Sequence, residues 1–563
     1  MSTMSGFSPD NFKRAFPLFQ QPENRQLVYL DNAATTQKPQ VVIDALCDFY
    51  LHSNANTHRS SHRLARRATD MLEGVRRDAV QFLGAASARE IIFTRGATEG
   101  LNLLAHSLCA DLEPGDEILL STAEHHANLV PWQMVAERRR LVIRYLPEVA
   151  GVPQFERLPE ALSTRTRIVS ITAGSNALGF RTDLAQVRRD LAGRDLSWVV
   201  DAAQLAAHES IDVQAIGCDF LVCSAHKFYG PTGIGLLYGR ESLLERMPPW
   251  QGGGEMIADV DLQSSHYADL PHRFEAGTSS LAEIAGLGAA IHFLRAQNRV
   301  AMAAHEQHLL HLAHKEIQPI AQVNLLTSAE NNLGILTLAS EHFAPVDLMQ
   351  WLDGRDIAVR VGHHCAQPLA RAAGHNATLR ASLAAYNTEQ DVERFVDAVR
   401  EFVQQLDGAP KITTPQAGGH SGDVNREVEW PEDDLAALDI EQLRQQKNWQ
   451  DRYRTLMGWS KVIGPKPQIR REENLVSGCE SSAWLVHREA GGRHYFAIDS
   501  DSRIVKGLAA LLLCQLDGKP GAEIDEGAIR AVFVELGLDQ QLSTSRSNGF
   551  SALLARALEF VES

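Results

Sequence analysis

Short apolar runs alternate with helix-spaced segments between residues 90 and 240. The runs are continuous rather than interrupted by polar residues, which is typical of strands buried on both faces of a sheet. They are Ile91-Ile92-Phe93, 117–120, 167–171, Trp198-Val199-Val200 and Phe220-Leu221-Val222. Residues 99–108 and 183–191, between these runs, have the spacing of helices. This order predicts an α/β fold with a mainly parallel sheet and helices on both faces, where ligands bind beyond the carboxyl ends of the strands.

After residue 280 the pattern predicts a helix over 281–294 and a smaller α+β unit over 300–405. From 407 to about 431, glycine and proline recur and apolar residues almost disappear, which predicts a flexible linker. Residues 435–457 then have the pattern of an amphipathic helix, and a compact α+β domain follows to a final helix over 550–561. We expect the following organisation: residues 1–405 with a large domain over about 31–295 and a small domain from the N-terminus and 296–405, a linker over 406–434, and a separate domain over 435–563.

Composition narrows the class of protein. The net charge of −16 and the absence of a Lys/Arg block argue against a nucleic-acid partner. The longest apolar runs, such as 508–514, are too short to span a bilayer, and residues 1–19 lack the apolar core of a signal peptide. Seven scattered cysteines without a CxxC pair are typical of reduced thiols. We therefore expect a cytoplasmic protein without a membrane partner.

A lysine directly follows one of the predicted strands. The segment Ser224-Ala225-His226-Lys227 leads into a turn rich in small residues, so Lys227 is placed at a strand end. A partly desolvated lysine is a good Schiff-base residue, and pyridoxal phosphate offers the aldehyde for it. Ser224 and His226 are positioned to hold the phosphate of that cofactor.

Two other strand ends carry groups that suit the same cofactor. Asp201 ends one strand and Gln204 follows it, and a carboxylate at this place keeps a pyridinium nitrogen protonated. The segment Thr94-Arg95-Gly96-Ala97-Thr98 joins a strand to a helix, so its backbone N–H groups at Ala97 and the hydroxyl of Thr98 suit a phosphate.

Each of these residues has an ordinary structural explanation when it is taken singly. An aspartate at a strand end is usually a cap, and a lone lysine is usually a solvated surface charge. The pairs His125-His126 and His363-His364, together with cysteines, leave a zinc site as an alternative. The phosphate turn, the strand-end aspartate and the strand-end Ser-x-His-Lys in this order are much more specific, and they favour pyridoxal phosphate with no metal.

Two cysteines lie in small-residue turns far apart in the chain. Cys365 stands in Gly362-His363-His364-Cys365-Ala366, and Cys479 in Val476-Ser477-Gly478-Cys479-Glu480. A cysteine is often a small buried hydrophobic residue. Two turns of this kind on either side of a linker instead predict a relay in which one thiol passes an atom to the other.

Residues 1–405 resemble the class II cysteine desulfurases, the SufS/CsdA-like branch of the fold-type I pyridoxal-phosphate superfamily. The matching stretches are Tyr29 to Thr36, Asn54 to Arg59, Glu124 to Asn128, Ser224 to Gly235, Gly253 to Ile257, Arg273 to Thr278 and Gly362 to Cys365. Residues 435–563 resemble the SufE/CsdE sulfur acceptors through Gly478-Cys479, Trp484, Ile504 to Gly507 and Leu542 to Gly549.

The first resemblance implies roles for residues of the cofactor site. Lys227 forms the Schiff base with pyridoxal phosphate, His125 stacks on the pyridine ring, Asp201 pairs with its nitrogen and Gln204 contacts its phenolic oxygen. The residues that the resemblance assigns to the phosphate are Ala97, Thr98, Ser224 and His226, together with Thr278, His58 and Arg59 from a second subunit. A homodimer is therefore expected.

The resemblance also implies the reaction. Asn176 and Arg380 bind the carboxylate of L-cysteine, and Cys365 takes its sulfur as a persulfide while alanine is released. Cys479 of the fused acceptor domain then receives that sulfur for a downstream protein. Four positions depart from the family pattern: Ser279-Ser280 replaces the usual Pro-Asn, Ala202 replaces Gly, and Glu480 replaces Gln. None removes a group that the chemistry needs.

Three functions remain open from the sequence. The first is sulfur supply to iron–sulfur cluster assembly. The second keeps the chemistry but changes the client to a tRNA-modification pathway, or changes the substrate to selenocysteine. The third is a non-catalytic docking or scaffold protein, against which intact Lys227, Asp201, Cys365 and Cys479 argue.

Overall fold

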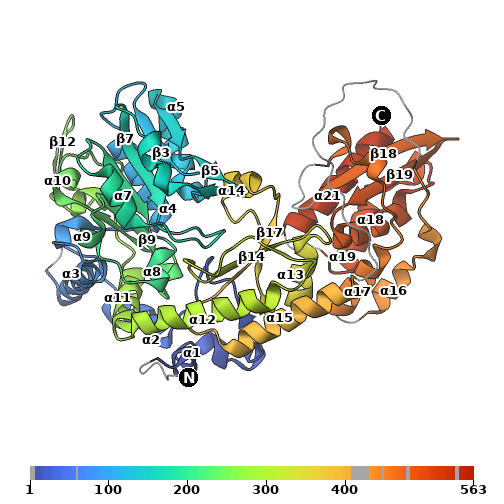
Figure 1. Cartoon of the computed structure of the whole chain (residues 1–563), viewed down its shortest axis with the longest axis horizontal. Coiled ribbons are helices and arrows are strands. Elements are labelled where there is room, and N and C mark those ends of the chain that lie inside the picture. The colour runs from blue at the N-terminus through green and yellow to red at the C-terminus, as the bar shows by residue number, and fades with distance from the viewer. Residues whose placement is uncertain are drawn as a thin grey trace. The chain divides into compact units, whose positions relative to one another are not determined.

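The computed structural model describes residues 7–58, 61–406, 430–446, 449–476, 482–538 and 544–562 (Figure 1). Arg59, Cys479 and almost all of the predicted linker lie outside these residues. Contacts divide the chain into two compact units. Unit 1 comprises 1–320, 325–338 and 356–397, and unit 2 comprises 321–324, 339–355 and 398–563.

A seven-stranded sheet forms the centre of unit 1, in the order β2-β10-β9-β8-β7-β3-β4. The strands are β2 (Ile91–Thr94), β3 (Glu117–Leu120), β4 (Val142–Tyr145), β7 (Thr166–Thr172), β8 (Ser197–Asp201), β9 (Phe220–Ser224) and β10 (Gly235–Gly239). The pairs β9-β8, β8-β7, β7-β3 and β3-β4 are parallel, and β10 is antiparallel to both of its neighbours. The predicted mainly parallel sheet is thus confirmed, and all five predicted strands are present.

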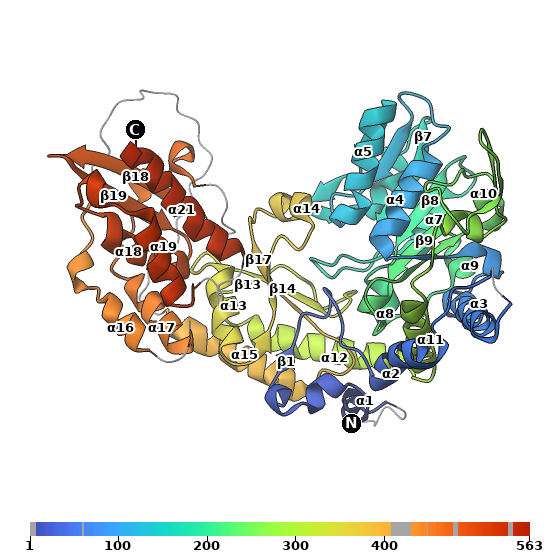
Figure 2. The same cartoon turned by 180° about the vertical axis from the view of Figure 1, so that it is seen from behind.

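Helices cover both faces of this sheet, as predicted. Alternate residues of the strands belong to two separate cores, so that Ile118 packs in one and Leu119 in the other. The core with Ile118 includes α4 (Ala97–Leu108) and α5 (Val130–Arg139), which lie along the sheet in Figure 2. The core with Leu119 includes α3 (Arg63–Leu83), α7 (Leu184–Leu191) and α11 (Leu281–Arg295). Burial on both faces explains why the strands have continuous apolar runs.

A smaller sheet in the order β13-β14-β17-β16 carries further polar residues. Its strands are β13 (Asn324–Leu325), β14 (Ile335–Ala339), β16 (Arg360–Gly362) and β17 (Thr378–Ser382). β1 (Val28–Tyr29) pairs in parallel with β15 (Ile357–Ala358), just before β16. Further helices of unit 1 are α1 (Pro9–Arg14), α2 (Gln40–Asp48), α12 (Arg299–Ile317) and α14 (Gln367–Ala372), and α15 (Glu389–Gln404) continues from unit 1 into unit 2. The N-terminal segment is thereby brought to the strand that leads into the loop with Cys365.

Unit 2 has its own apolar core around α18 (Arg503–Leu516), where Leu508, Leu511 and Leu512 are buried. The hairpin of β18 (Ala483–Ala490) and β19 (Arg493–Ser500) packs with it, as do α17 (Trp449–Trp459), α19 (Glu526–Glu535) and α21 (Thr544–Glu562). No helix among the residues that the structure describes is both long enough and apolar enough to cross a membrane.

Two helix predictions for this region were wrong in their bounds. Residues 435–457 do not form one helix, because a 3₁₀ turn at Leu435–Ala437, α16 (Ile440–Gln445) and α17 are separate. Asp439 explains why a new helix begins at Ile440, since its side chain accepts the N–H of Glu441 and so caps α16. The final helix begins at Thr544 rather than Phe550, because the helix anchored by buried Phe550 and Leu553 extends back over a segment whose polar sequence is typical of a turn.

The helix α18 begins at a carboxylate supplied by α13 (Pro345–Asp353). Asp347 is buried and accepts hydrogen bonds from the hydroxyl of Ser502 at 3.1 Å and the backbone N–H of Arg503 at 3.0 Å. The first N–H groups of a helix have no partner within it, so a carboxylate placed there stabilises the helix. The segment 339–355 is thus tied to the core helix of unit 2.

Candidate active site

Lys227 lies at the carboxyl end of β9, in the 3₁₀ turn Ala225–Lys227. Burial lowers the pKa of Lys227 to about 8, and the nearby carboxylate of Asp201 opposes that shift. About half of an amine with this pKa is unprotonated at pH 8 and about a tenth at pH 7, far more than for an ordinary lysine. The amine of Lys227 is therefore able to act as a nucleophile or as a base.

Asp201 and Gln204 occupy the carboxyl end of the neighbouring strand β8. Asp201 is buried, and its carboxylate accepts the N–H of Ala203 at 2.9 Å. Burial raises the pKa of Asp201, while that N–H group and the charge of Lys227 oppose the shift. The amide of Gln204 donates to the carbonyl oxygen of Ala33 at 2.9 Å, so a loop distant in sequence holds it. Because β8 and β9 are parallel, these groups and Lys227 share one edge of the sheet.

The turn between β2 and α4, where we expect a phosphate to bind, approaches Ser224 closely. Gly96 has a φ of 147°, and a Cβ added there would lie 3.2 Å from the hydroxyl oxygen of Ser224. The N–H of Ala97 donates to that oxygen at 2.8 Å, which joins the turn to the Ser-x-His-Lys segment. Thr98 is exposed in the first turn of α4. The N–H groups at the start of this 12-residue helix suit a phosphate.

His226 and His125 are both held as neutral rings. Burial lowers the pKa of His226 to about 4 and that of His125 to about 3, and the charge of Lys227 adds to both shifts. The Nδ1 atom of His125 accepts the N–H of Ala127 at 3.0 Å, which fixes the ring at the start of its turn. A neutral, fixed imidazole suits stacking on an aromatic ring.

The loop that carries Cys365 follows β16 and lies against the histidine turn. The thiol residue is exposed, and both His364 and Cys365 have positive φ, at 52° and 55°. The N–H of His126 donates to the carbonyl oxygen of Cys365 at 2.7 Å, and the N–H of Gln367 donates to Nε2 of His126 at 3.2 Å. Left-handed backbone at non-glycine residues costs about 1–3 kcal/mol and is concentrated at functional sites.

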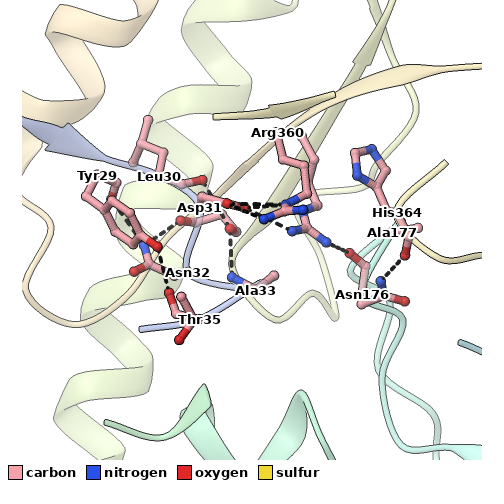
Figure 3. Close-up of polar contacts among 12 residues, drawn as sticks. Tyr29, Leu30, Asp31, Asn32, Ala33, Thr35, Asn176, Ala177, Arg360 and His364 are labelled. Atoms are coloured by element: carbon pink, nitrogen blue, oxygen red, sulfur yellow. Dashed lines mark hydrogen bonds and ion pairs between the residues drawn. The ribbon is translucent and has the colours of Figure 1, made fainter. Parts of the chain in front are cut away.

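Arg380 is buried at the centre of a polar network. Figure 3 shows other members of this network, among them Asp31, Asn176 and Arg360. The guanidinium of Arg380 donates to the carbonyl oxygen of Asn176 at 2.8 Å and to the carboxylate of Asp31 at 3.1 Å. Asn176 in turn donates to the carbonyl oxygen of His364 at 2.6 Å, and Arg360 pairs with the same carboxylate of Asp31 at 2.8 Å. Two guanidiniums share one carboxylate, so the network keeps a positive charge. The Nε of Arg380 is buried without a partner among the described residues.

Sequence reasoning missed three supporting residues. Asp31 anchors Arg380, and Lys38 donates to the carbonyl oxygen of His226 at 3.0 Å, with its pKa lowered to about 7 by burial. Glu124 is buried behind His125, and the side chain of Asn128 donates to it at 2.6 Å. Burial raises the pKa of Glu124 to about 8. Asp31 and Glu124 stand in segments that already carried the family resemblance, which was the only signal for them.

The structure gathers most of the predicted site residues in unit 1. Asp201, Arg380 and Cys365 each act electrostatically on Lys227, and Cys365 also acts on Arg380. Thr278 is exposed and lines a cavity of about 310 Å³ together with Thr94 and Arg95 of the phosphate turn. The predictions for Arg59 and Cys479 fall outside the described residues.

The chain matches two protein families. Residues 28–395 match the family described as Aminotransferase class-V, and residues 438–561 match the Fe-S metabolism associated domain, SufE. It is 43% identical over 404 residues to a cysteine desulfurase of Escherichia coli O157:H7, which covers 71% of this chain and 99% of that protein. It is 44% identical over 395 residues to a probable cysteine desulfurase of Mycobacterium leprae, covering 69% of this chain but 64% of that protein.

Solved structures of cysteine desulfurases have the same fold as unit 1. The S-sulfonic acid form of CsdA from Escherichia coli superimposes with a TM-score of 0.66 at 38% identity, covering 71% of this chain and 99% of that one. The apo enzyme from Thermococcus onnurineus superimposes with a TM-score of 0.68 at 32% identity, covering 72% of this chain and 100% of that one. The predicted fold-type I architecture is thereby confirmed.

Proposed function

The chain belongs to the cysteine desulfurase branch of the class-V aminotransferase family and has a SufE-type domain at residues 438–561, and we propose that it converts L-cysteine to L-alanine and carries the sulfur on its own cysteines. One observation supports this most strongly. Lys227 and Asp201 follow or end neighbouring parallel strands, and Arg380 and Cys365, from two other segments, act electrostatically on Lys227. A scaffold protein would not need an amine with a pKa near 8 beside a buried carboxylate.

The residues present fit pyridoxal phosphate. Asp201 offers a buried carboxylate for the pyridinium nitrogen, His125 a neutral ring for stacking, and Lys227 an amine of lowered pKa for the aldehyde. Gly96 leaves room beside Ser224, and α4 directs its first N–H groups toward that space. When bound, the cofactor withdraws electrons from the α-carbon of the substrate and so makes its sulfur available for transfer.

Residues of the protein bind the substrate, transfer the proton and accept the sulfur. The partner-free Nε and the net positive charge around Arg380 suit the carboxylate of cysteine, with Asn176 holding the neighbouring loop in place. Lys227 removes the α-proton and returns a proton to the product. The thiolate of Cys365 attacks the substrate sulfur, so that one C–S bond breaks and one S–S bond forms. Cysteine and the Cys365 thiol thus become alanine and a persulfide.

We propose that the persulfide sulfur passes next to Cys479. A linker of roughly 25 residues with the composition of 406–434 spans about 25–30 Å on average and gives an effective concentration near millimolar where the geometry allows. Fusion therefore makes the first transfer intramolecular, within one chain or across a homodimer. The match to an Fe-S metabolism associated domain supports iron–sulfur cluster assembly as the destination.

Two measurements test this function. Purified protein should release alanine from cysteine in step with sulfide under a mild reductant, and it should show the yellow absorption of lysine-bound pyridoxal phosphate. Protein that binds no such cofactor would be a docking module instead.

The client is identified by a separate experiment, in which proteins are captured from the native cell by the persulfidated chain, with the Cys479→Ser chain as control. Capture of an iron–sulfur scaffold supports the proposal, whereas capture of a tRNA-modification enzyme would replace cluster assembly as the destination. Selenocysteine is tested as a competing substrate by kcat/KM.

A further inference from the structure

Two histidines and one glutamate meet in unit 1, away from Lys227. His58 lies in the loop before α3, Glu73 lies on α3, and His272 begins the 3₁₀ turn His272–Phe274. One ligand atom from each lies within 4.8 Å of the others, and the rings of His58 and His272 have centroids 5.1 Å apart. Three segments distant in sequence thus place three metal-binding groups together.

Only one of the two oxygen atoms of the Glu73 carboxylate has a hydrogen-bond partner among the described residues. Its Oε2 atom is 3.3 Å from the Nε atom of Arg76, but its Oε1 atom is buried and has no hydrogen-bond partner among the described residues. Buried carboxylate oxygens nearly always have a partner, so an orphaned one needs an explanation. A bound cation between Glu73 and the two imidazoles would provide it.

The surrounding charges favour a cation in spite of the nearby arginine. Both terminal nitrogens of Arg76 are paired with Glu275, at 2.7 Å and 2.9 Å, and Arg76 also donates to the carbonyl oxygen of Ile91. Its charge is therefore neutralised by Glu275. Two carboxylates against one guanidinium leave a net negative charge beside the imidazoles. His58 also has a φ of 61°, a conformation that is uncommon for a non-glycine residue and found often at functional sites.

We propose that His58, Glu73 and His272 form a site for a divalent transition metal of the zinc class. Two imidazoles and one carboxylate are a ligand set that zinc favours, and the exposed side of His58 leaves a fourth position for water. An ion at the centre of a triangle with 4.8 Å sides lies about 2.8 Å from each atom, against about 2.0–2.2 Å in a bound zinc site. The ligand atoms must therefore move inward by less than about 1 Å, which rotation of exposed His58 and half-exposed His272 permits.

The site would link segments that serve the proposed phosphate site. Glu275, three residues after His272, accepts the N–H of Phe93 at 2.7 Å on the strand that leads into the phosphate turn. Thr278 follows in the same segment, and His58 was itself expected to serve a second subunit. Bound metal would fix all three segments together, so it should raise the thermal stability of the protein that holds it.

Zinc titration of the cofactor-loaded protein tests the site, with Cys365→Ser and Cys479→Ser present to remove competing thiolates. We expect one ion per chain by calorimetry, ligation by imidazole and oxygen without sulfur in X-ray absorption, and a higher Tm with zinc. Glu73→Gln keeps the shape of the side chain and should weaken zinc binding by about tenfold or more, and His272→Ala should do the same. His311→Ala is the matched control, since His311 pairs with Glu330 at 3.0 Å on the surface.

The outcomes are distinguishable. Weaker zinc binding and loss of the Tm increase in Glu73→Gln and His272→Ala establish the site, provided that cofactor absorption is unchanged and that His311→Ala binds zinc like the parent. Zinc affinity within about twofold of the parent in Glu73→Gln would overturn the proposal, as would sulfur in the ligand set. Because cofactor absorption and metal binding are read separately, failure of this site leaves the proposed desulfurase activity standing.

Discussion

The backbone N–H of His126 donates a hydrogen bond of 2.7 Å to the carbonyl oxygen of Cys365. The two residues are far apart in sequence, yet this bond fixes the thiol loop against the turn that carries His125. The bond therefore ties the loop of Cys365, the nucleophile expected to attack the substrate, to the turn of His125, whose ring is expected to stack on the cofactor. This contact supports the proposal that sulfur transfer at Cys365 and substrate binding take place in one site.

Lys227→Ala should abolish alanine formation. The amine both anchors the cofactor and moves the α-proton, and loss of a positioned base alone costs about 10²–10⁴-fold in rate. Alanine released from cysteine is the measurement, with Lys315→Ala, an exposed lysine on α12, as control. Full turnover in Lys227→Ala would show that the cofactor assignment is wrong.

Cofactor uptake by the apo-protein should rise with pH through about 8. The pKa of Lys227 is lowered from 10.5 to about 8, so the nucleophilic amine predominates above that pH and the unreactive ammonium below it. Asp201 opposes this lowering, so Asp201→Asn should move the midpoint to lower pH. The rise of the yellow absorption, followed at a series of pH values, gives the midpoint. A midpoint near 10.5 would mean that Lys227 is not desolvated.

Arg380→Lys should raise the KM for cysteine about 10- to 100-fold, because hydrogen bonds to charged groups contribute about 1.5–3 kcal/mol. The lysine keeps the charge but loses the fork that bonds both Asn176 and Asp31. Steady-state kinetics separates KM from kcat, and Arg530→Lys on the surface of unit 2 is the control. An unchanged KM would place the substrate carboxylate elsewhere.

A homodimer in which Thr278 serves the partner's site predicts complementation. Lys227→Ala and Thr278→Ala chains should each be impaired alone, but a mixed dimer contains one site with both residues intact. Activity should therefore return when the two variants are unfolded and refolded together, and native mass should be twice that of the chain. No recovery in verified mixed dimers would show that Thr278 acts within its own subunit.

Asp347→Ala should destabilise unit 2 by about 1–2 kcal/mol, the usual cost of losing a helix cap. It removes the acceptor for Ser502 and for the N–H of Arg503 at the start of α18. Denaturant unfolding monitored by tryptophan fluorescence measures the change, with Asp111→Ala in unit 1 as control. Equal stability of the two variants would contradict the capping role.

Much of the large sheet could be predicted from the sequence, and the polar network could not. Apolar runs as continuous as Phe220-Leu221-Val222 are typical of a strand covered on both faces, and the strand-end positions of Lys227 and Asp201 follow from it. Arg380 and Asp31 are 349 residues apart, so their ion pair depends on tertiary folding that no local pattern encodes. The break near Asp439 was missed for another reason: a capping side chain overrode an amphipathic spacing.

We propose that sulfur passes from the substrate to Cys365 and from there to Cys479. Mass spectrometry of the two cysteine peptides, after brief exposure to cysteine and alkylation, follows both steps. The wild-type chain should carry persulfide on both peptides, Cys479→Ser on Cys365 alone, and Cys365→Ser on neither. Persulfide on Cys479 in the Cys365→Ser protein would contradict the claim, since sulfur would then reach the second domain without passing the first.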